Sequence, residues 1–447
     1  MPYEFYIRVA RYSHQELTLL KQFGNKRNVV SGSHYFHERG VCMNSGDIAW
    51  MLISTALVVF MVPGLALFYG GMDRSKNVLN MLNMNMYCIG IVPLLWVTFS
   101  WTLGNSSDGS GFWGGDLIGN WDQFGLEGLN MDPESLIFVA FLMTFASITP
   151  ALISGAVADR MKFSAWAIFV PIWMLLVYTP VTYWVYSGWH HEMGAIDFAG
   201  GTAIHINAGA ASLALILVLG KRKGWPSDSS PPHNLPLVML GTGILWFGWF
   251  GFNAGSAGAA NGQAVQALLN TFVAAAAGMI GWILIEKIKD GKPTTLGACS
   301  GVVAALVAIT PAAGYVGGLA SIVFGLVAGV GCYFLIGLKN KLGYDDSLDV
   351  VGVHGGGGVI GGLLLGLFAD NSAINSEPGG FQDGLFFGGG ELFIDQIVAM
   401  VSVIGFSFVV TFVIAKALDS TIGLRASQED EESGLDQSQH AETAYNL

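Results

Sequence analysis

Long apolar stretches recur along the whole chain and are separated by short polar connections. Each is about as long as the roughly 20 mostly apolar residues that a helix needs to cross a bilayer. They are too long and too glycine-rich for the alternating strands of an outer-membrane barrel. We predict eleven membrane-spanning helices, at residues 48–69, 79–103, 135–157, 164–187, 200–219, 236–254, 264–286, 295–312, 315–338, 351–369 and 392–418. The pattern therefore predicts an all-α polytopic membrane protein.

The basic residues after position 42 fall in alternate connections. All fourteen of them follow or end an odd-numbered span, and the loops after the even-numbered spans contain none. Basic loops stay on the cytoplasmic side of a membrane. This distribution predicts that the N-terminus lies outside and the C-terminus inside.

An odd number of spans and two matching fragments indicate an inverted repeat of five plus five spans, with one more at the end. Span five opens with Asp197 and contains His205, and span ten opens with Asp349 and contains His354. A half with an odd number of spans comes out inverted when it is repeated. We therefore expect a membrane domain over residues 47–418 and a cytoplasmic regulatory tail. The predicted parts are two halves at about 47–220 and 236–370, a final helix at 392–418, and the acidic tail at 419–447.

Residues 1–42 conflict with this topology, because they carry six basic residues on the predicted outer side. They also lack the apolar core of a signal peptide. We predict a non-native or disordered extension, with translation starting at Met43, just before a polar lead into the first span. The alternative is a genuine disordered leader.

Composition supports a membrane protein and narrows its chemistry. Hydrophobic residues make up 52% of the 447 residues and charged residues only 12%, with a net charge of −12, whereas soluble domains average about 25% charged residues. The predicted midplane contains no ring of acidic residues that would hold a permanent cation. Neither a nucleotide-binding P-loop nor a zinc-protease motif is present, so we expect neither an enzyme nor a cofactor.

Two histidines are the main chemical candidates. Placing an ionisable residue inside a membrane costs free energy, so such residues are usually functional. His205 and His354 lie well inside their spans. A single membrane histidine is equally well explained as a neutral imidazole bonded to a neighbouring helix. Two at equivalent places in inverted halves would face each other near the centre, where they could relay a proton. Asp197 stands just before span five, at a helix N-cap position.

Other features carry less weight. Taken alone, the aromatic run of Trp246, Phe247, Trp249, Phe250 and Phe252 is better interpreted as a lipid-facing belt than as a pore mouth. The four cysteines lack metal-ligand spacing, and the adjacent His190 and His191 do not share a helix face, which disfavours a metal site. Asn105 begins a glycosylation sequon in a predicted outer loop.

From about Asp47 to Asn446, the chain resembles the ammonium transporter family (Amt, with the related Mep and Rh proteins). The most specific stretch runs from Asp197 to Gly209. Further matching motifs are Phe68–Gly71, Phe247–Ser256, Gly297–Gly301, Val353–His354, Gly423–Arg425 and Gly434–Asp436.

The resemblance implies a multi-pass homotrimer in the cell (plasma) membrane, with one pore per subunit, that conducts ammonium or ammonia for nitrogen uptake. It implies ammonium and methylammonium as substrates, contact with membrane lipid and no nucleic acid. A PII-type regulatory protein would dock on the cytoplasmic face.

The resemblance also implies roles for particular residues. His205 and His354 are similar to the twin-histidine pair of the pore, and Phe145 and Phe252 to the stacked phenyl gate. Phe141 and Ser256 resemble part of the outer recruitment site, and Asp197 a structurally required aspartate. An aromatic wall of that site matches Tyr186, although a one-residue gap would make it Trp189.

Three rival functions remain. A potassium channel would need a carbonyl filter or an acidic ring, and neither motif is present. A gas or water pore of the Rh kind would not concentrate charged methylammonium. An ammonium sensor that hardly transports would usually carry a signalling domain after the last span.

Overall fold

The structure, a computed structural model, describes residues 43–105, 117–129, 132–227, 231–374 and 381–445. The predicted extension at residues 1–42 lies outside this part. The described residues form helices without a named strand, and the only pairing of strand type among them is an isolated bridge between Met161 and Arg425. The prediction of an all-α chain that crosses the membrane several times is confirmed.

Ten helical segments in the described part are long and apolar enough to cross a membrane. They are Ser45–Met72, Val78–Asn105, Pro133–Val157, Phe163–Met193, Gly201–Leu219, Leu235–Gly255, Gly262–Lys289, Gly318–Leu342, Val351–Phe368 and Glu391–Thr421. The remaining predicted span, the eighth (295–312), corresponds to a shorter apolar helix, α13 (Thr295–Ile309). Its second half is almost completely buried, so it is an inner helix enclosed by its neighbours. The count of eleven spans and their orientation stay predictions.

Most spans are one continuous helix. These are α3 (Ser45–Met72), α6 (Pro133–Ser154), α11 (Leu235–Gly255), α12 (Gly262–Lys289), α14 (Gly318–Leu342) and α17 (Glu391–Thr421). Short helices also stand outside the spans: η3 (Phe124–Leu126), α16 (Asn371–Ile374), η8 (Leu385–Phe387), α18 (Gln428–Ser433) and α19 (Leu435–His440).

Four other spans contain a π-helical turn, and α6 continues into a 3-10 turn, η4 (Gly155–Val157). The composite spans are α4 (Val78–Leu95) with η1 (Trp96–Ser100) and α5 (Trp101–Asn105); α7 (Phe163–Trp173) with η5 (Met174–Tyr178), α8 (Thr179–Tyr186) and α9 (Trp189–Met193); η6 (Gly201–Ile206) with α10 (Asn207–Leu219); and η7 (Val351–Gly356) with α15 (Gly357–Phe368). Single π-turns inside helices often mark functional sites, and both pore-candidate histidines lie in such turns.

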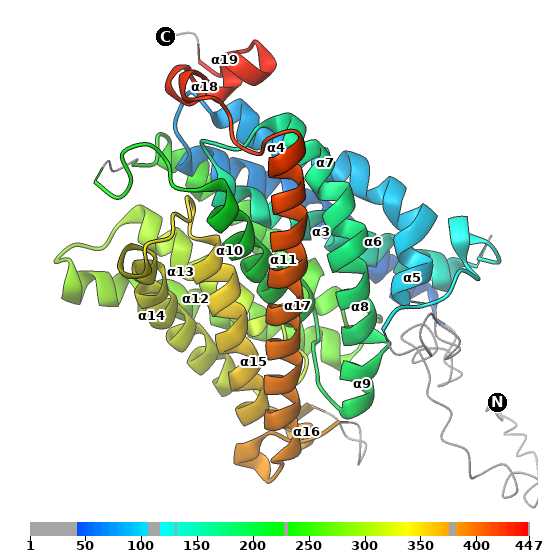
Figure 1. Cartoon of the computed structure of the whole chain (residues 1–447). Coiled ribbons are helices and arrows are strands. Elements are labelled where there is room, and N and C mark those ends of the chain that lie inside the picture. Colours follow the sequence, from blue (N-terminus) through cyan, green and yellow to red (C-terminus); the bar gives the residue numbers. More distant parts are fainter. Residues whose placement is uncertain (1–42, 106–116, 130–131, 228–230, 375–380, 446–447) are drawn as a thin grey trace, which may run out of the picture.

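Small residues bring the helices into backbone contact. A Cβ atom on Gly241 of α11 would come within 2.4 Å of the Phe68 nitrogen of α3, and one on Gly209 of α10 within 2.3 Å of the Gly355 Cα in η7. Neither approach leaves room for a methyl group, and such small residues are typical of close helix contacts in membranes. The bundle that results has α18 and α19 at one end and α9 and α16 at the other (Figure 1).

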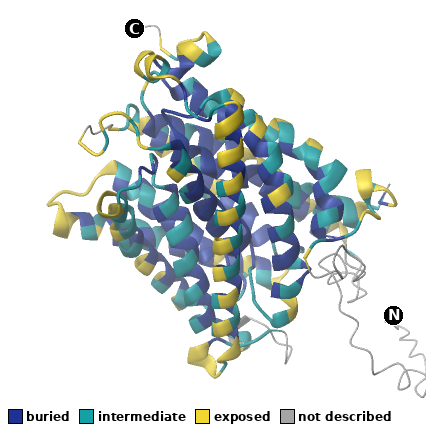
Figure 2. Cartoon of the chain, in the orientation of Figure 1, coloured by how far each residue is buried: buried dark blue, intermediate teal, exposed yellow. Residues whose placement is uncertain are grey.

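Burial follows the faces of the helices. Buried residues fill the interior of the bundle, and exposed ones lie along outward faces such as that of α17 (Figure 2). The exposed faces remain apolar, with residues such as Phe272, Leu284, Leu319, Val401 and Val413 more than half exposed. A surface of this kind is suited to lipid or to another apolar partner rather than to water.

Candidate functional site

A cavity of about 360 Å³ lies next to α9 and is lined in part by His191 of that helix; we call it the vestibule. Five of the predicted site residues line it: Phe141, Phe145, Tyr186, Asp197 and Ser256. Trp189 is not among the described lining residues, because its ring packs 4.0 Å from that of His190 and 5.9 Å from that of Trp184. Of the two aromatic candidates, the structure therefore brings Tyr186 to the vestibule.

Two parallel phenyl rings close the inner end of the vestibule. The ring centroids of Phe145 on α6 and Phe252 on α11 are 4.2 Å apart with an angle of 2° between the planes. Both side chains are fully buried, and the Phe141 ring packs at 4.8 Å against Phe145. An apolar stack of this kind excludes hydrated ions, because a polar or charged group loses its solvation there.

The two histidines meet just beyond the stack. His205 in η6 and His354 in η7 have their Nδ1 atoms 3.2 Å apart and their rings tilted by 17°, and both are buried. The His205 ring lies 6.2 Å from that of Phe252. The structure thus brings the predicted pair together directly behind the predicted gate.

Two further aromatic residues, neither of them predicted to contact the histidines, hold this pair. Trp249 stacks on His205 at 5.5 Å and donates its indole hydrogen to the Thr310 hydroxyl at 2.8 Å. The Tyr69 hydroxyl lies 3.5 Å from Nε2 of His354 and donates to the Leu152 carbonyl at 3.1 Å. Both rings are buried.

The interpretation of the aromatic run as a lipid-facing belt holds only for one side of α11. Phe247 is 55% exposed, but Trp249 and Phe252 are at most 2% exposed, so the belt interpretation is wrong for these two. Residues 249 and 252 are three apart and share a helix face. The signal was therefore present in the spacing, but the spacing does not say which face points inward.

A carboxylate caps each histidine helix. Asp197 accepts hydrogen bonds from the backbone nitrogens of residues 200, 201, 202 and 203, at 2.6 to 2.9 Å. In the other half, Asp346 accepts from the Val351 nitrogen at 2.7 Å. Both acids stand eight residues before their histidine. The four unpaired nitrogens at a helix start explain why an acid is favoured at these places.

The pairing of Asp197 with Asp349 is therefore corrected. Asp349 has a positive φ of 65° and its carboxylate bonds the Lys339 ammonium at 2.5 Å. It anchors the turn before η7 rather than capping that helix. The residue in the position equivalent to Asp197 is Asp346.

The described residues contain no group of three or more His, Cys, Asp or Glu side chains that could hold a metal ion. His190 instead bonds the Ser402 hydroxyl at 2.8 Å, and Cys88, Cys299 and Cys332 are buried free thiols. Asn105 is also buried, and its amide donates to the Trp101 carbonyl.

Sequence comparison decides the family. The model of the Ammonium Transporter Family matches residues 49–445. This chain belongs to the ammonium transporter family. It is 49% identical to an ammonium transporter of Mycobacterium tuberculosis (strain ATCC 25618 / H37Rv) over 439 residues, covering 90% of this chain and 91% of the relative. It is 48% identical to an ammonium transporter of Bacillus subtilis (strain 168), covering 90% and 99%.

Solved structures of this transporter family agree. Saccharomyces cerevisiae Mep2 matches with a TM-score of 0.80 and 33% identity, covering 87% of this chain and 88% of that one. A structure described as a sensor Amt protein matches with a TM-score of 0.79 and 28% identity, covering 88% and 98%. The predicted family is confirmed, and this is a family of transporters rather than enzymes.

Proposed function

We propose that this transporter recruits ammonium in the vestibule and conducts ammonium or ammonia through an apolar pore past the twin histidines, for nitrogen uptake. The observation that carries the proposal is the order of the parts. The vestibule with Tyr186 and Ser256 leads to the Phe145–Phe252 stack, and the stack leads to His205 and His354. Each part suits one step of moving a cation that can give up its proton.

Recruitment follows from the lining of the vestibule. Aromatic faces attract a cation through their quadrupole, and Phe141 and Tyr186 supply such faces. The Ser256 hydroxyl donates to the Phe252 carbonyl at 2.9 Å, so its oxygen lone pairs are free to accept a hydrogen bond from ammonium. Potassium has no hydrogen to donate and gains less from this contact.

The hydrogen bonds around the histidines give the relay a direction. Because the Tyr69 hydroxyl donates to Leu152, its oxygen accepts from Nε2 of His354. Nδ1 of His354 is then the acceptor for the proton on Nδ1 of His205. This leaves Nε2 of His205, which has no partner among the described residues, as a bare acceptor for a proton or for ammonia.

Discrimination follows from the same arrangement. The stack and the buried pair penalise any ion that keeps its charge. Ammonium can leave its proton on the bare imidazole nitrogen of His205 and continue as ammonia, whereas potassium cannot. This supports transport of ammonium and of methylammonium, which also carries a removable proton.

Electrophysiology on proteoliposomes tests the proposal. Ammonium and methylammonium should each elicit transport, and potassium at the same concentration should not. Equal responses to ammonium and potassium would reject the selective mechanism. Gas-like conduction without current would retain the pore but reject net charge transfer.

The assembly and setting are part of the proposal. We infer a homotrimer in the cell (plasma) membrane, with the N-terminus outside, the tail inside, and lipid around the apolar faces. A PII-type protein would bind at the cytoplasmic face. Cross-linking in membranes and pull-down at low and high ammonium test these two associations.

A second candidate is an ammonium sensor. Two observations favour it. The helices α18 and α19 pack on the cytoplasmic loops, with the Lys76 ammonium bonded to the carbonyls of Glu431 and Glu432 at 2.8 and 2.6 Å. One structural relative is described as a sensor. Ammonium-dependent exposure of the tail without measurable transport would favour sensing.

A further inference from the structure

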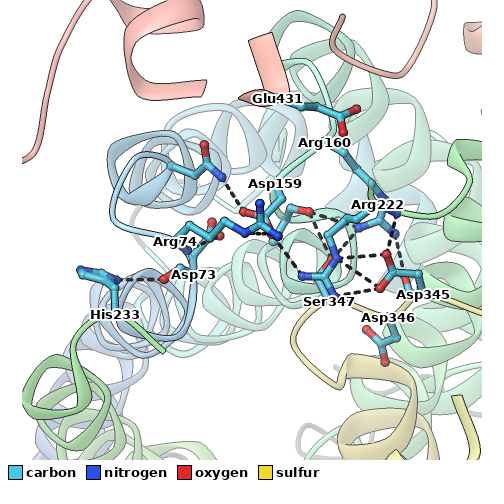
Figure 3. Close-up of polar contacts among 12 residues, drawn as sticks. Asp73, Arg74, Asp159, Arg160, Arg222, His233, Asp345, Asp346, Ser347 and Glu431 are labelled. Atoms are coloured by element: carbon cyan, nitrogen blue, oxygen red, sulfur yellow. Dashed lines mark hydrogen bonds and ion pairs between the residues drawn. The ribbon is translucent and has the colours of Figure 1, made fainter. Parts of the chain in front are cut away.

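Two buried aspartates lie at the end of the bundle that carries the tail helices (Figure 3). Asp73 follows α3, and Asp159 follows η4 with a positive φ of 72°. They are only 3% and 6% exposed. Oδ1 of Asp73 accepts from the Arg74 nitrogen at 2.7 Å, but Oδ2 has no donor among the described residues.

Positive charge gathers around Asp159 rather than Asp73. Oδ2 of Asp159 lies 3.1 Å from Nη1 of Arg222 and 3.6 Å from Nε of Arg74, and the Asn77 amide bonds its other oxygen. Asp159 is therefore the ionised member. The orphan oxygen of Asp73 is satisfied if it carries a proton and donates it to Asp159.

The charges of the site agree with one shared proton. Burial, together with the neighbouring Asp159 carboxylate, raises the pKa of Asp73 well above its usual range. Burial also acts to raise the pKa of Asp159, but the hydrogen bond from Asp73 and the charges of Arg222 and Arg74 outweigh it and lower that pKa. Two neighbouring buried carboxylates repel each other, so ionising both of them is energetically unfavourable.

Two short chains of hydrogen bonds join this pair to the tail. Asn77 bonds Asp159 through its amide and accepts from the Leu435 nitrogen at 2.8 Å through its oxygen. The carbonyl of Asp73 lies 2.9 Å from Nδ1 of His233, whose Nε2 lies 2.8 Å from the Tyr445 hydroxyl. Leu435 is fully buried, so the tail helps to keep water away from the pair.

We propose that Asp73 and Asp159 form a proton-binding site whose occupancy controls the docking of α18 and α19 on the cytoplasmic loops. When the proton passes to water, two adjacent buried carboxylates remain. Their repulsion and their demand for hydration are relieved when the tail leaves and water enters. Docking is therefore strongest at low cytoplasmic pH and is lost as the pH rises through the pKa of Asp73.

The effects of other charged groups near the pair must be distinguished from the effect of the pair itself. They are Arg74 and Lys76 after α3, Arg160 beside Asp159, Arg222 and its partner Asp345, His233 before α11, and Glu431, Glu432, Asp436 and His440 of the tail. His233 is the main competitor, because its imidazole lies in direct contact with the Asp73 carbonyl. The test therefore includes a variant of it.

Hydrogen exchange measures docking directly on the full-length protein in nanodiscs. The backbone nitrogen of Leu435 donates to Asn77 and that of Asp436 to the Lys76 carbonyl, so their protection reports the docked tail. After correction for intrinsic exchange, protection should fall about tenfold per pH unit between the pKa of Asp73 in the undocked protein and its higher pKa in the docked protein, since one proton is coupled. Protection that stays flat across the pH series would overturn the proposal.

Three variants show which group causes the pH dependence of tail protection. Asp73→Asn supplies a permanent donor to Asp159, and we expect the tail to stay protected at every pH. The matched control Glu429→Gln removes one charge from an exposed position on α18 and should keep the wild-type pH course. So should His233→Gln. A wild-type course in Asp73→Asn, or its loss in His233→Gln alone, would assign the proton elsewhere.

Infrared spectroscopy of the wild type keeps the test decisive if Asp73→Asn does not fold. A protonated carboxyl group has its own carbonyl stretch, which should disappear over the same pH interval in which tail protection falls. A spectrum without such a titrating band would exclude a shared proton.

Discussion

The two histidine helices, η6 and η7, reach the same geometry by different means. Asp197 binds four backbone nitrogens at the start of η6. Asp346 binds the Val351 nitrogen at the start of η7, and its Oδ1 has no partner among the described residues. The turn before η7 is held in addition by Lys339, which bonds the Asp346 carbonyl and the Asp349 carboxylate. The start of η6 therefore depends on Asp197 alone, whereas Asp346 and Lys339 together hold the start of η7.

This contrast predicts that the two halves respond unequally to the same kind of substitution. Asp197→Ala should have the largest effect, because it leaves four buried backbone donors unpaired, at a cost on the order of 4 kcal/mol or more. Thermal unfolding of purified protein and its yield in membranes measure this. Normal stability and assembly without transport would instead make Asp197 a pore residue.

His205→Ala and His354→Ala should weaken ammonium transport about tenfold to a hundredfold, because each removes a hydrogen bond to a charged or proton-sharing group. His205 should be the more severe, since its Nε2 is the bare acceptor next to the gate. Transport in a transport-deficient host, with discrimination against potassium, is the measurement. Full and selective uptake by both variants would refute the proposed role.

Asp346→Ala should destabilise the protein by about 1–3 kcal/mol, since it leaves one backbone donor unpaired, and less than Asp197→Ala does. The comparison is made on melting temperatures of the two variants in one detergent. If Asp346→Ala were the more destabilising, the contacts of Lys339 would not support the start of η7, and the contrast between the two halves would be wrong.

Tyr69→Phe should have the smallest effect. It removes a hydroxyl that bonds Leu152 and approaches His354, which is worth about 1 kcal/mol, so transport should fall several-fold with little change in stability. Uptake assays at matched expression check this. An unchanged rate would show that Tyr69 does not set the direction of the relay.

Ten of the predicted spans and the Asp197 cap follow from local patterns in the sequence, and the facing of the two histidines follows from the expected inverted repeat. It misplaced the second cap, since the fragment from Asp349 to His354 looks like the one from Asp197 to His205, whereas the bond that occupies Asp349 comes from Lys339 on another helix. Trp249 was assigned to the lipid-facing belt, and Tyr69 was given no role, for a similar reason. Which face of an apolar helix turns inward is decided by its neighbours, such as Thr310 and Leu152.

The contact between Gly209 and Gly355 has a consequence for motion. These backbones touch, each within about one turn of helix beyond its histidine, so the two helices that carry the imidazoles cannot come closer without a collision. The smallest distance between the two histidine helices at the centre of the pore is therefore set by their backbones. The temperature dependence of conduction should then reflect the turning of the phenyl rings rather than any rocking of one half against the other.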